Sequence, residues 1–192
     1  MDKYKLTIIL LIISTILYVQ FSSAETISAC GTLNGAGIKY NLNQKAISST
    51  GTCISVLANN TILDCQGNTI TYSTSSIGNA INNSGYSNVS IRNCNIVLGK
   101  SIDKAHTINF TAAANGTIHN NTININYSQS GEIIILTEGA NGNNISSNNL
   151  SIKHAAIAAI DLISSNNTII EFNIINASNN SQGIATSEAS GL

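Results

Sequence analysis

The sequence has few charged and few aromatic residues, and these absences limit what the protein can be. Charged residues make up 9% and aromatic residues 5% of the 192 residues, and there is no tryptophan. Eight Lys and Arg residues against nine Asp and Glu residues give a net charge of −1, which excludes a basic nucleic-acid-binding surface. After residue 24, no apolar run approaches the roughly 20 residues that a membrane-spanning helix needs.

Two residue types dominate what is present. The chain contains 29 Asn and 33 Ile residues, which together exceed a quarter of its length. These two side chains have opposite solvent preferences, and such a bias is typical of a repeated unit. The length corresponds to one domain or part of one.

The N-terminus has the pattern of a secretory signal peptide, which we place at residues 1–24. Lys3 and Lys5 precede an apolar stretch over residues 6–19, and small residues at 22–24 offer a cleavage site. We therefore expect a mature chain that begins near Glu25 and is secreted or held at the cell surface, with no membrane span after cleavage. The alternative is an uncleaved membrane anchor, for which the apolar stretch is short.

A repeat fills the rest of the chain. Its copies are NVSIRNCNI at 88–96, NGTIHNNTI at 115–123, NNISSNNL at 143–150 and NNTIIEFNI at 166–174, with a longer variant, NNTILDCQGNTI, at 59–70. Apolar residues alternate with polar ones within each copy, which is the period of a β-strand. The shared apolar position falls at Ile62, Ile91, Ile118, Ile145 and Ile169. A further short apolar segment precedes four of the copies, at 54–56, 108–110, 134–136 and 160–162, and another follows the last copy at 184–186.

Three short strands in every 24–29 residues predict an all-β solenoid. The sequence therefore predicts a parallel β-helix of about five or six turns, in which inward Ile side chains stack into columns. Residues 25–58 form N-terminal capping turns and residues 59–192 form the repeats. An Ala-rich segment at 153–162 could form a helix, but its place in the repeat predicts a strand. No cap is recognisable after residue 186, so we expect either a truncated reading frame or another chain that covers this end.

The motif N-x-[ST]-I-x-x-N-x-I resembles the repeats of right-handed parallel β-helices of the pectate-lyase-like superfamily. That superfamily includes a periplasmic copper-accessory family and many archaeal surface proteins. The segments CGTLN, YNLNQ, GTCISV and ANNTILDCQGNTI resemble the N-terminal turns of those surface proteins. The resemblance covers the whole mature chain and implies a right-handed coil. It leaves the function open, because this fold carries lyases, hydrolases, adhesins and passive scaffolds.

The four cysteines allow three disulfide connectivities, of which one fits the repeat best. Cys65 and Cys94 each lie three residues after an equivalent Ile, so they are neighbours in one column. Adjacent strands are about 4.8 Å apart, which a disulfide can span. A Cys65–Cys94 bond leaves Cys30 to pair with Cys53. No C-x-x-C pair is present, which disfavours a zinc site.

The Asn residues could serve two roles, as structural side chains within the fold and as sites of N-glycosylation. We expect a structural column in which these side chains satisfy backbone groups at a turn. Its members are Asp64, Asn93, Asn120, Ser147 and Glu171. Twelve N-x-[ST] sequons also occur, and Asn120 should carry no glycan because its column is predicted to be internal. The candidate glycosylation sites are Asn59, Asn82, Asn88, Asn115, Asn166 and Asn179.

No catalytic set is evident. The outward column that contains Asp161 offers one carboxylate rather than the pair that glycoside hydrolysis needs, so Asp161 is interpreted as a solvated edge residue. Arg92 is the only Arg, and no acid shares its predicted column in adjacent turns. Glu132 and Glu138 supply too few ligands for calcium. The three His residues share no register, which gives no support to copper binding or a catalytic triad. We predict no catalytic residues, no metal and no cofactor.

The expected function is a structural, adhesive or glycan-contacting role at the cell surface, without catalysis. Its partner would be a polysaccharide or another component of the cell envelope. Tyr86, Tyr127 and Asp161 are weak candidates for ligand contact. The alternative is a carbohydrate-active enzyme, a lyase or a hydrolase, whose catalytic residues lie outside this chain.

Overall fold

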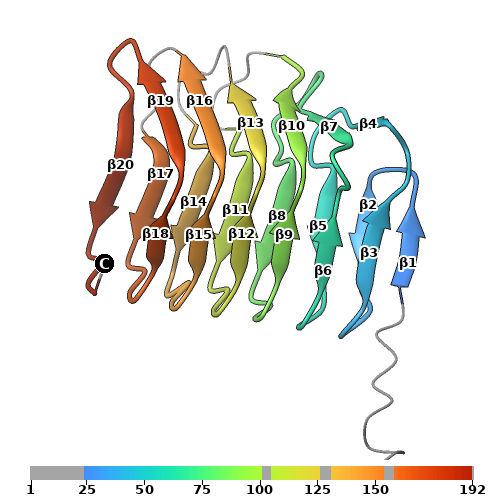
Figure 1. The fold of residues 1–192 in the computed structure, drawn as a ribbon, viewed down its shortest axis with the longest axis horizontal. Helices are drawn as coiled ribbons and strands as arrows, with labels where there is room; N and C mark the ends of the chain where they lie inside the picture. The colour runs from blue at the N-terminus through green and yellow to red at the C-terminus, as the bar shows by residue number, and fades with distance from the viewer. Residues whose placement is uncertain (1–23, 101–104, 126–130, 154–157, 192) are drawn as a thin grey trace, which may run out of the picture.

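The computed structural model describes residues 24–100, 105–125, 131–153 and 158–191. The predicted signal peptide lies outside these residues, except for Ala24, which is the first residue of a strand. The described residues contain twenty β-strands and no helix (Figure 1). Among them no helix is long and apolar enough to cross a membrane.

The strands are short, most having three or four residues, because Asn, Ser, Thr and Gly interrupt the aliphatic segments. They are β1 (Ala24–Ile27), β2 (Gly31–Leu33), β3 (Lys39–Leu42), β4 (Ala46–Ser48), β5 (Ile54–Val56), β6 (Ile62–Asp64), β7 (Thr69–Tyr72), β8 (Ile81–Ser84), β9 (Ser90–Arg92), β10 (Asn95–Leu98), β11 (Ile108–Thr111), β12 (Thr117–His119), β13 (Thr122–Ile125), β14 (Ile134–Thr137), β15 (Asn144–Ser146), β16 (Asn149–Lys153), β17 (Ala158–Ile163), β18 (Ile169–Glu171), β19 (Ile174–Ser178) and β20 (Gln182–Ser187).

All three sheets are parallel, and the chain visits them in turn. Sheet A has the order β1-β3-β6-β9-β12-β15-β18, sheet B the order β2-β5-β8-β11-β14-β17-β20, and sheet C the order β4-β7-β10-β13-β16-β19. One strand from each sheet forms a rung, and successive rungs stack along the long axis (Figure 1). The chain is therefore a parallel β-solenoid of about six turns, as the repeat predicts. β1 and β2 add an incomplete rung at the N-terminal end.

The core consists of aliphatic columns that run along the axis. In sheet C, for example, Ile70, Ile96, Ile123 and Leu150 occupy equivalent positions in four successive rungs, and all are fully buried. One rung alone could not remove these side chains from water, whereas neighbouring rungs cover both sides of each one. The strand expected in the Ala-rich segment is confirmed at β17, although residues 154–157 lie outside the described chain.

The predicted register is wrong by one residue in two rungs. Leu63 and Ile170, rather than Ile62 and Ile169, pair with the inward column of sheet A. Both segments contain two consecutive aliphatic residues, so alternation alone fits either phase, and a shift of one residue moves every side chain to the other face. Asp64 and Glu171 consequently stand opposite Arg92 and Ser146, outside the column to which we assigned them.

Candidate functional site

Two disulfides brace the N-terminal half of the solenoid, with the predicted connectivity. Cys30 bonds to Cys53 and closes the first rungs. Cys65 bonds to Cys94 across two rungs, with 4.7 Å between their Cα atoms. Disulfides persist in oxidising compartments, so the two bonds indicate an extracellular environment or one similarly oxidising.

The segment that carries Cys65 is longer than its equivalents. Four residues separate β6 from β7, whereas two separate β9 from β10 and β12 from β13. The additional residues, Gln66 and Gly67, have left-handed backbone angles, with φ of 54° and 79°. The Gly67 N–H donates to the carbonyl of Asn93 at 2.7 Å, which ties the longer turn to the next rung. The turn is thereby fixed at both ends, by the disulfide and by this hydrogen bond.

An open groove of about 650 Å³ lies beside this turn, where sheets A and C meet. One wall is the turn itself, and the floor comes from the two following rungs. Its side chains are amides, one hydroxyl and the disulfide, and none of them is charged. The lining residues are Gln66, Gly67, Asn93, Cys94, Asn95, Asn120 and Thr122.

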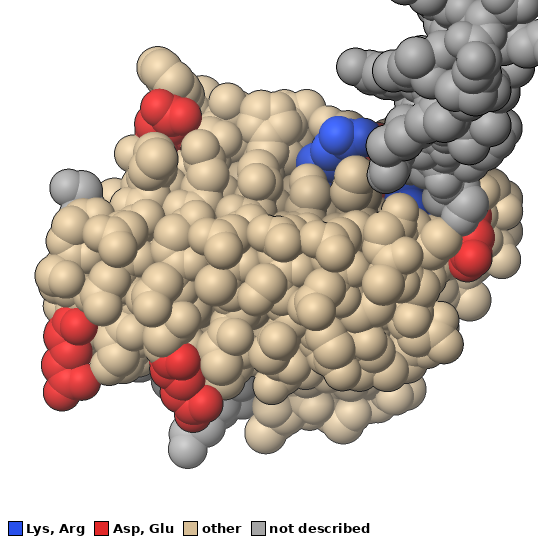
Figure 2. Space-filling model, turned by 90° about the horizontal axis from the view of Figure 1, so that it is seen from below, with Lys and Arg blue, Asp and Glu red and all other residues tan. Residues whose placement is uncertain are grey.

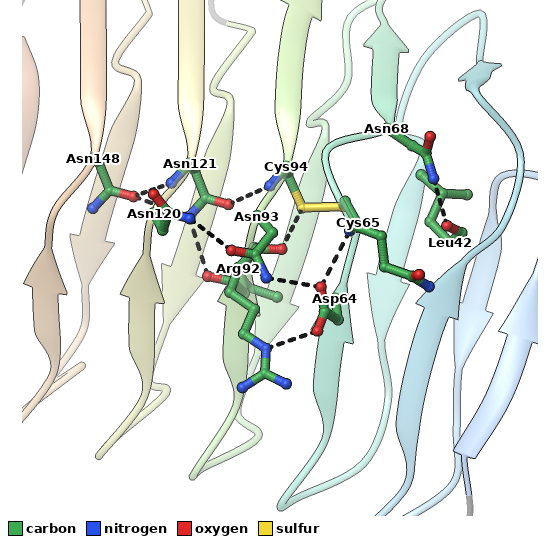
Figure 3. Close-up of a disulfide and its surroundings, with 12 residues drawn as sticks. Leu42, Asp64, Cys65, Asn68, Arg92, Asn93, Cys94, Asn120, Asn121 and Asn148 are labelled. Atoms are coloured by element: carbon green, nitrogen blue, oxygen red, sulfur yellow. Dashed lines mark hydrogen bonds and ion pairs between the residues drawn. A yellow bond between two sulfur atoms is a disulfide. The ribbon is translucent and has the colours of Figure 1, made fainter.

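Asp64 organises the polar side chains at the edge of the groove (Figure 3). Its Oδ2 atom contacts Lys39 Nζ at 3.2 Å and Arg92 Nε at 3.1 Å, and its Oδ1 atom accepts from Asn93 Nδ2 at 2.9 Å and from the Gln66 N–H at 3.1 Å. Burial alone would raise the pKa of Asp64. The hydrogen bonds from Asn93, Gln66 and Lys39, with the charge of Arg92, outweigh burial and lower that pKa.

The statement that no acid shares a column with Arg92 is therefore wrong. Asp64 is its partner in the preceding rung, and the error follows from the one-residue shift in register. Lys39 lies one rung further back in the same sheet. Asp64 thus contacts two cations, so these three side chains together carry one net positive charge, and in the described chain the groove edge presents no carboxylate without a cationic partner.

The predicted Asn column is confirmed only in its middle part. Asn120 Nδ2 donates to Asn93 Oδ1 at 2.8 Å, and Asn93 donates in turn to Asp64. Asn93, Asn120 and Ser147 have left-handed φ angles of 56°, 53° and 57°, which Asn tolerates well. The column is not internal, however, because Asn120 is exposed. Our reason for excluding a glycan at Asn120 therefore fails, since its side chain is accessible.

At the C-terminal end of this column stands Phe172, not Glu171. Phe172 has a φ of 56° and is 81% exposed. Glu171 pairs with Ser146 in the neighbouring column. The hydrogen-bonded part of the column therefore comprises Asn93 and Asn120, and Asn93 also donates to Asp64 in the neighbouring column.

A second Asn ladder, which our sequence analysis did not assign, lies inside the solenoid. Asn121 Oδ1 accepts from the Cys94 N–H at 3.0 Å, and Asn148 Oδ1 accepts from the Asn121 N–H at 2.9 Å (Figure 3). Asn173 Oδ1 likewise accepts from the Asn148 N–H at 2.9 Å. Asn121 and Asn148 are both about 1% exposed. The second Asn of the repeated motif falls at these positions, and this recurrence is the signal that could have identified the ladder.

Cys94 occupies the ladder position in its own rung. The Thr122 N–H donates to its carbonyl, just as the Asn149 N–H donates to the carbonyl of Asn121. The disulfide therefore replaces one rung of the buried amide ladder.

A cluster of ionisable side chains lies on sheet B and at the corner before it. His106 Nδ1 is in contact with a carboxylate oxygen of Glu132. Asp161 belongs to β17 and is 6% exposed, so its interpretation as a solvated edge residue is wrong. Burial raises the pKa of Asp161, and the negative charge of Glu132 raises it further, while the Leu162 N–H and His106 oppose the increase.

This arrangement places Asp161, whose pKa is raised, near Glu132 and His106. A carboxyl group with a raised pKa is one of the features that general acid catalysis uses. Glu132 lies at a corner rather than in the column of Asp161, which explains why a search along columns did not find the pair. Among the described residues, no group of three or more His, Cys, Asp or Glu is placed to hold a metal ion.

The remaining predicted residues are dispersed. Tyr86 is half-buried against the core and lies outside the groove, and Tyr127 lies outside the described residues. Of the candidate glycosylation sites, Asn82 and Asn166 are half-buried and accept hydrogen bonds through Oδ1. The exposed candidates are Asn59, Asn88, Asn115 and Asn179.

The two buried aspartates should show opposite dependence on pH when each is replaced by Asn. Because the pKa of Asp64 is lowered by folding, its ionised form stabilises the protein above the ordinary value of 3.8, and this contribution is lost as the pH falls through the folded pKa. We expect Asp64→Asn to be less stable than wild type at pH 7, with a difference that shrinks at acidic pH.

Asp161 should affect the dependence of stability on pH in the opposite direction. Because folding raises its pKa, stability falls as the pH rises from 3.8 through the folded pKa. We expect Asp161→Asn to gain stability relative to wild type between acidic pH and pH 7. Chemical unfolding at pH 3 to 7 measures both variants, and a parallel pH dependence of the two would contradict the assignment.

Comparison with known proteins returned no match to a family model, a curated protein or a solved structure.

Proposed function

We propose that this protein is an exported β-solenoid module that contacts glycans through the groove beside the Cys65–Cys94 disulfide, without catalysis. The observation that carries the proposal is the composition of the groove. Its side-chain amides and its hydroxyl can both donate and accept hydrogen bonds, as sugar hydroxyl groups require.

Rigidity supports the same proposal. The disulfide, the Gly67–Asn93 hydrogen bond and the contacts of Asp64 hold the groove walls before any ligand arrives. A preorganised site loses less conformational entropy on binding, which matters most where individual contacts are weak.

Secretion or surface attachment, cleavage of residues 1–24 and glycosylation at exposed sequons belong to the same proposal. The two disulfides support export. We also propose a right-handed coil related to the pectate-lyase-like superfamily, a proposal supported by the parallel rungs and by the general right-handedness of parallel crossover connections.

Binding of the mature chain to a glycan array tests the function. We expect the double variant Asn93→Ala/Asn120→Ala to bind at least about tenfold more weakly, because two hydrogen-bonding groups worth about 1 kcal/mol each are removed. Asn179→Ala, at an exposed Asn outside the groove lining, is the matched control. Equal binding by wild type and the double variant would place the site elsewhere.

A carbohydrate-active enzyme is the second candidate, and the cluster of His106, Glu132 and Asp161 favours it. Degradation of the same polysaccharides, followed by the release of reducing ends, distinguishes the two functions. Turnover that Asp161→Asn abolishes would overturn the non-catalytic proposal and assign the chemistry to this chain.

The last rung exposes apolar side chains that another chain could cover, as one of the two sequence-based expectations for this end requires. In the last rung, Ile169 and Ile174 occupy the outward positions that Asn144 and Asn149 occupy in the preceding rung. The two Ile side chains are 55% and 67% exposed. The core residue Ile184 is 46% exposed. We propose these apolar side chains as the surface that such a chain would cover.

A further inference from the structure

The outer face of sheet C carries two parallel columns of uncharged side chains, which are polar except for Val97. The first column contains Thr69, Asn95, Thr122 and Asn149 in four successive rungs. The second, two residues further along each strand, contains Thr71, Val97, Asn124 and Ser151. We call these eight residues the sheet C face.

The sheet C face is uncharged. Within the six strands of sheet C as the structure describes them, the one charged residue is Lys153, which lies beyond both columns at the end of β16. Sheet A differs, since its outward positions include Lys39, Asp64 and Arg92. Figure 2 shows a different view, from below, in which separate acidic groups and a few Lys and Arg side chains stand among uncharged residues.

The groove and the sheet C face are continuous. Asn95 and Thr122 line the groove and also belong to the first column. Asn95 Nδ2 donates to Thr69 Oγ1 at 3.0 Å, which fixes the orientation of that amide. In the described chain, the side chains of Thr122, Asn124 and Asn149 make no hydrogen bond, and all three are exposed. Their donors and acceptors are therefore available to a ligand.

The spacing of the columns defines how a ligand would lie. Neighbouring rungs are about 4.8 Å apart, and two residues along a strand span about 6.6 Å. A chain that runs along the solenoid axis meets an equivalent hydroxyl or amide at every rung. A chain that runs along a strand meets only two positions before it leaves the sheet. The long direction of the array is therefore the axis.

We propose that the groove and the sheet C face together bind an uncharged polysaccharide, whose extended chain lies along the solenoid axis and across the strands. The inference rests on the proposed glycan-binding function and names its ligand class and direction. Ionised sugars are disfavoured on the sheet C face, because carboxylate or sulfate groups would lose water there without meeting a cation. The cations nearest the groove, Lys39 and Arg92, already pair with Asp64. Successive hydrogen bonds from several rungs add up to an affinity that one contact could not supply.

The experiment compares two classes of probe on the mature chain. Dextran, mannan and laminarin are the uncharged probes, and polygalacturonate and heparin are the anionic ones, with binding measured by affinity electrophoresis and calorimetry. We expect binding to at least one uncharged probe and to neither anionic probe. The protein should be produced in a host without N-glycosylation, because Thr122 completes the sequon of Asn120.

Two lysine substitutions test the surface. We expect Thr122→Lys and Asn124→Lys each to weaken binding of the uncharged probe about tenfold, because each replaces a hydrogen-bonding group by a bulky charge. Thr117→Lys is the matched control, since Thr117 is an outward Thr of the same rung on sheet A. Thermal unfolding of each variant shows whether the fold is retained.

The outcomes separate the two proposals. If no probe of either class binds and the glycan array is blank, the proposed function fails. If anionic probes bind, or if Thr117→Lys weakens binding as much as Thr122→Lys, the glycan-binding function stands and the inference about class and surface is overturned.

Discussion

Replacing Cys65 and Cys94 together by Ala is expected to lower the free energy of unfolding by about 3–4 kcal/mol, from the loop-closure entropy of a cross-link over 29 residues. The covalent bond joins two neighbouring rungs in the half of the solenoid that also contains the groove. Urea unfolding of the oxidised wild type and the double variant measures the difference. A change below about 1 kcal/mol would show that stacking alone fixes these rungs.

The same position allows a sharper comparison. Because Cys94 occupies a position of the buried amide ladder, Cys65→Ala/Cys94→Asn should recover about 1 kcal/mol relative to the double Ala variant. The new amide would donate to the preceding rung as Asn121 Nδ2 donates to the Ile91 carbonyl. Neither variant contains this disulfide, so their difference reports the ladder alone. Equal stability of the two variants would mean that Asn at residue 94 does not join the ladder.

Removal of an inner ladder residue is the second large effect. Asn148→Ala leaves the Asn121 N–H without its acceptor and the Ile118 carbonyl without the donor at 2.8 Å. Unpaired buried groups cost about 1–3 kcal/mol each, so we expect a loss of about 2–4 kcal/mol. Hydrogen exchange should show faster exchange at the Asn121 amide.

The control is the next residue. Asn149 is exposed and its side chain forms no hydrogen bond in the described chain, so Asn149→Ala should change stability by no more than about 0.5 kcal/mol. Similar losses for the two variants would refute a special role for the inner ladder.

The general architecture could be predicted because it repeats. A single strand such as β9 or β12 carries a weak signal, but the same alternation at five places in the chain fixes the fold class and the three strands of each rung. Agreement among the five copies compensates for the ambiguous strand signal of each single copy. The Cys65–Cys94 bond is as predicted, although Cys65 stands opposite Asn93 and does not share a column with Cys94.

The register at both ends of the repeat could not be obtained in this way. Ile62-Leu63 and Ile169-Ile170 are aliphatic pairs, and only contacts with neighbouring rungs decide which member points inward. That one-residue error hid the Asp64–Arg92 ion pair, because it placed the two residues in different columns.

The candidate site was missed for a different physical reason. The groove depends on the conformation of Gln66 and Gly67, two residues that interrupt the repeat. The pairing of His106 with Glu132 arises at a corner, where the strand period no longer predicts which side chains meet. In both places, the functional candidates are the positions that depart from the periodic pattern.

The buried amide ladder also gives the solenoid a direction. Each Asn side chain accepts from the backbone of the rung before it, so Asn121 serves Cys94, Asn148 serves Asn121, and Asn173 serves Asn148. Both cross-links lie before residue 95. Covalent reinforcement of the described chain is therefore confined to its first rungs, and the later rungs are joined by hydrogen bonds and packing alone.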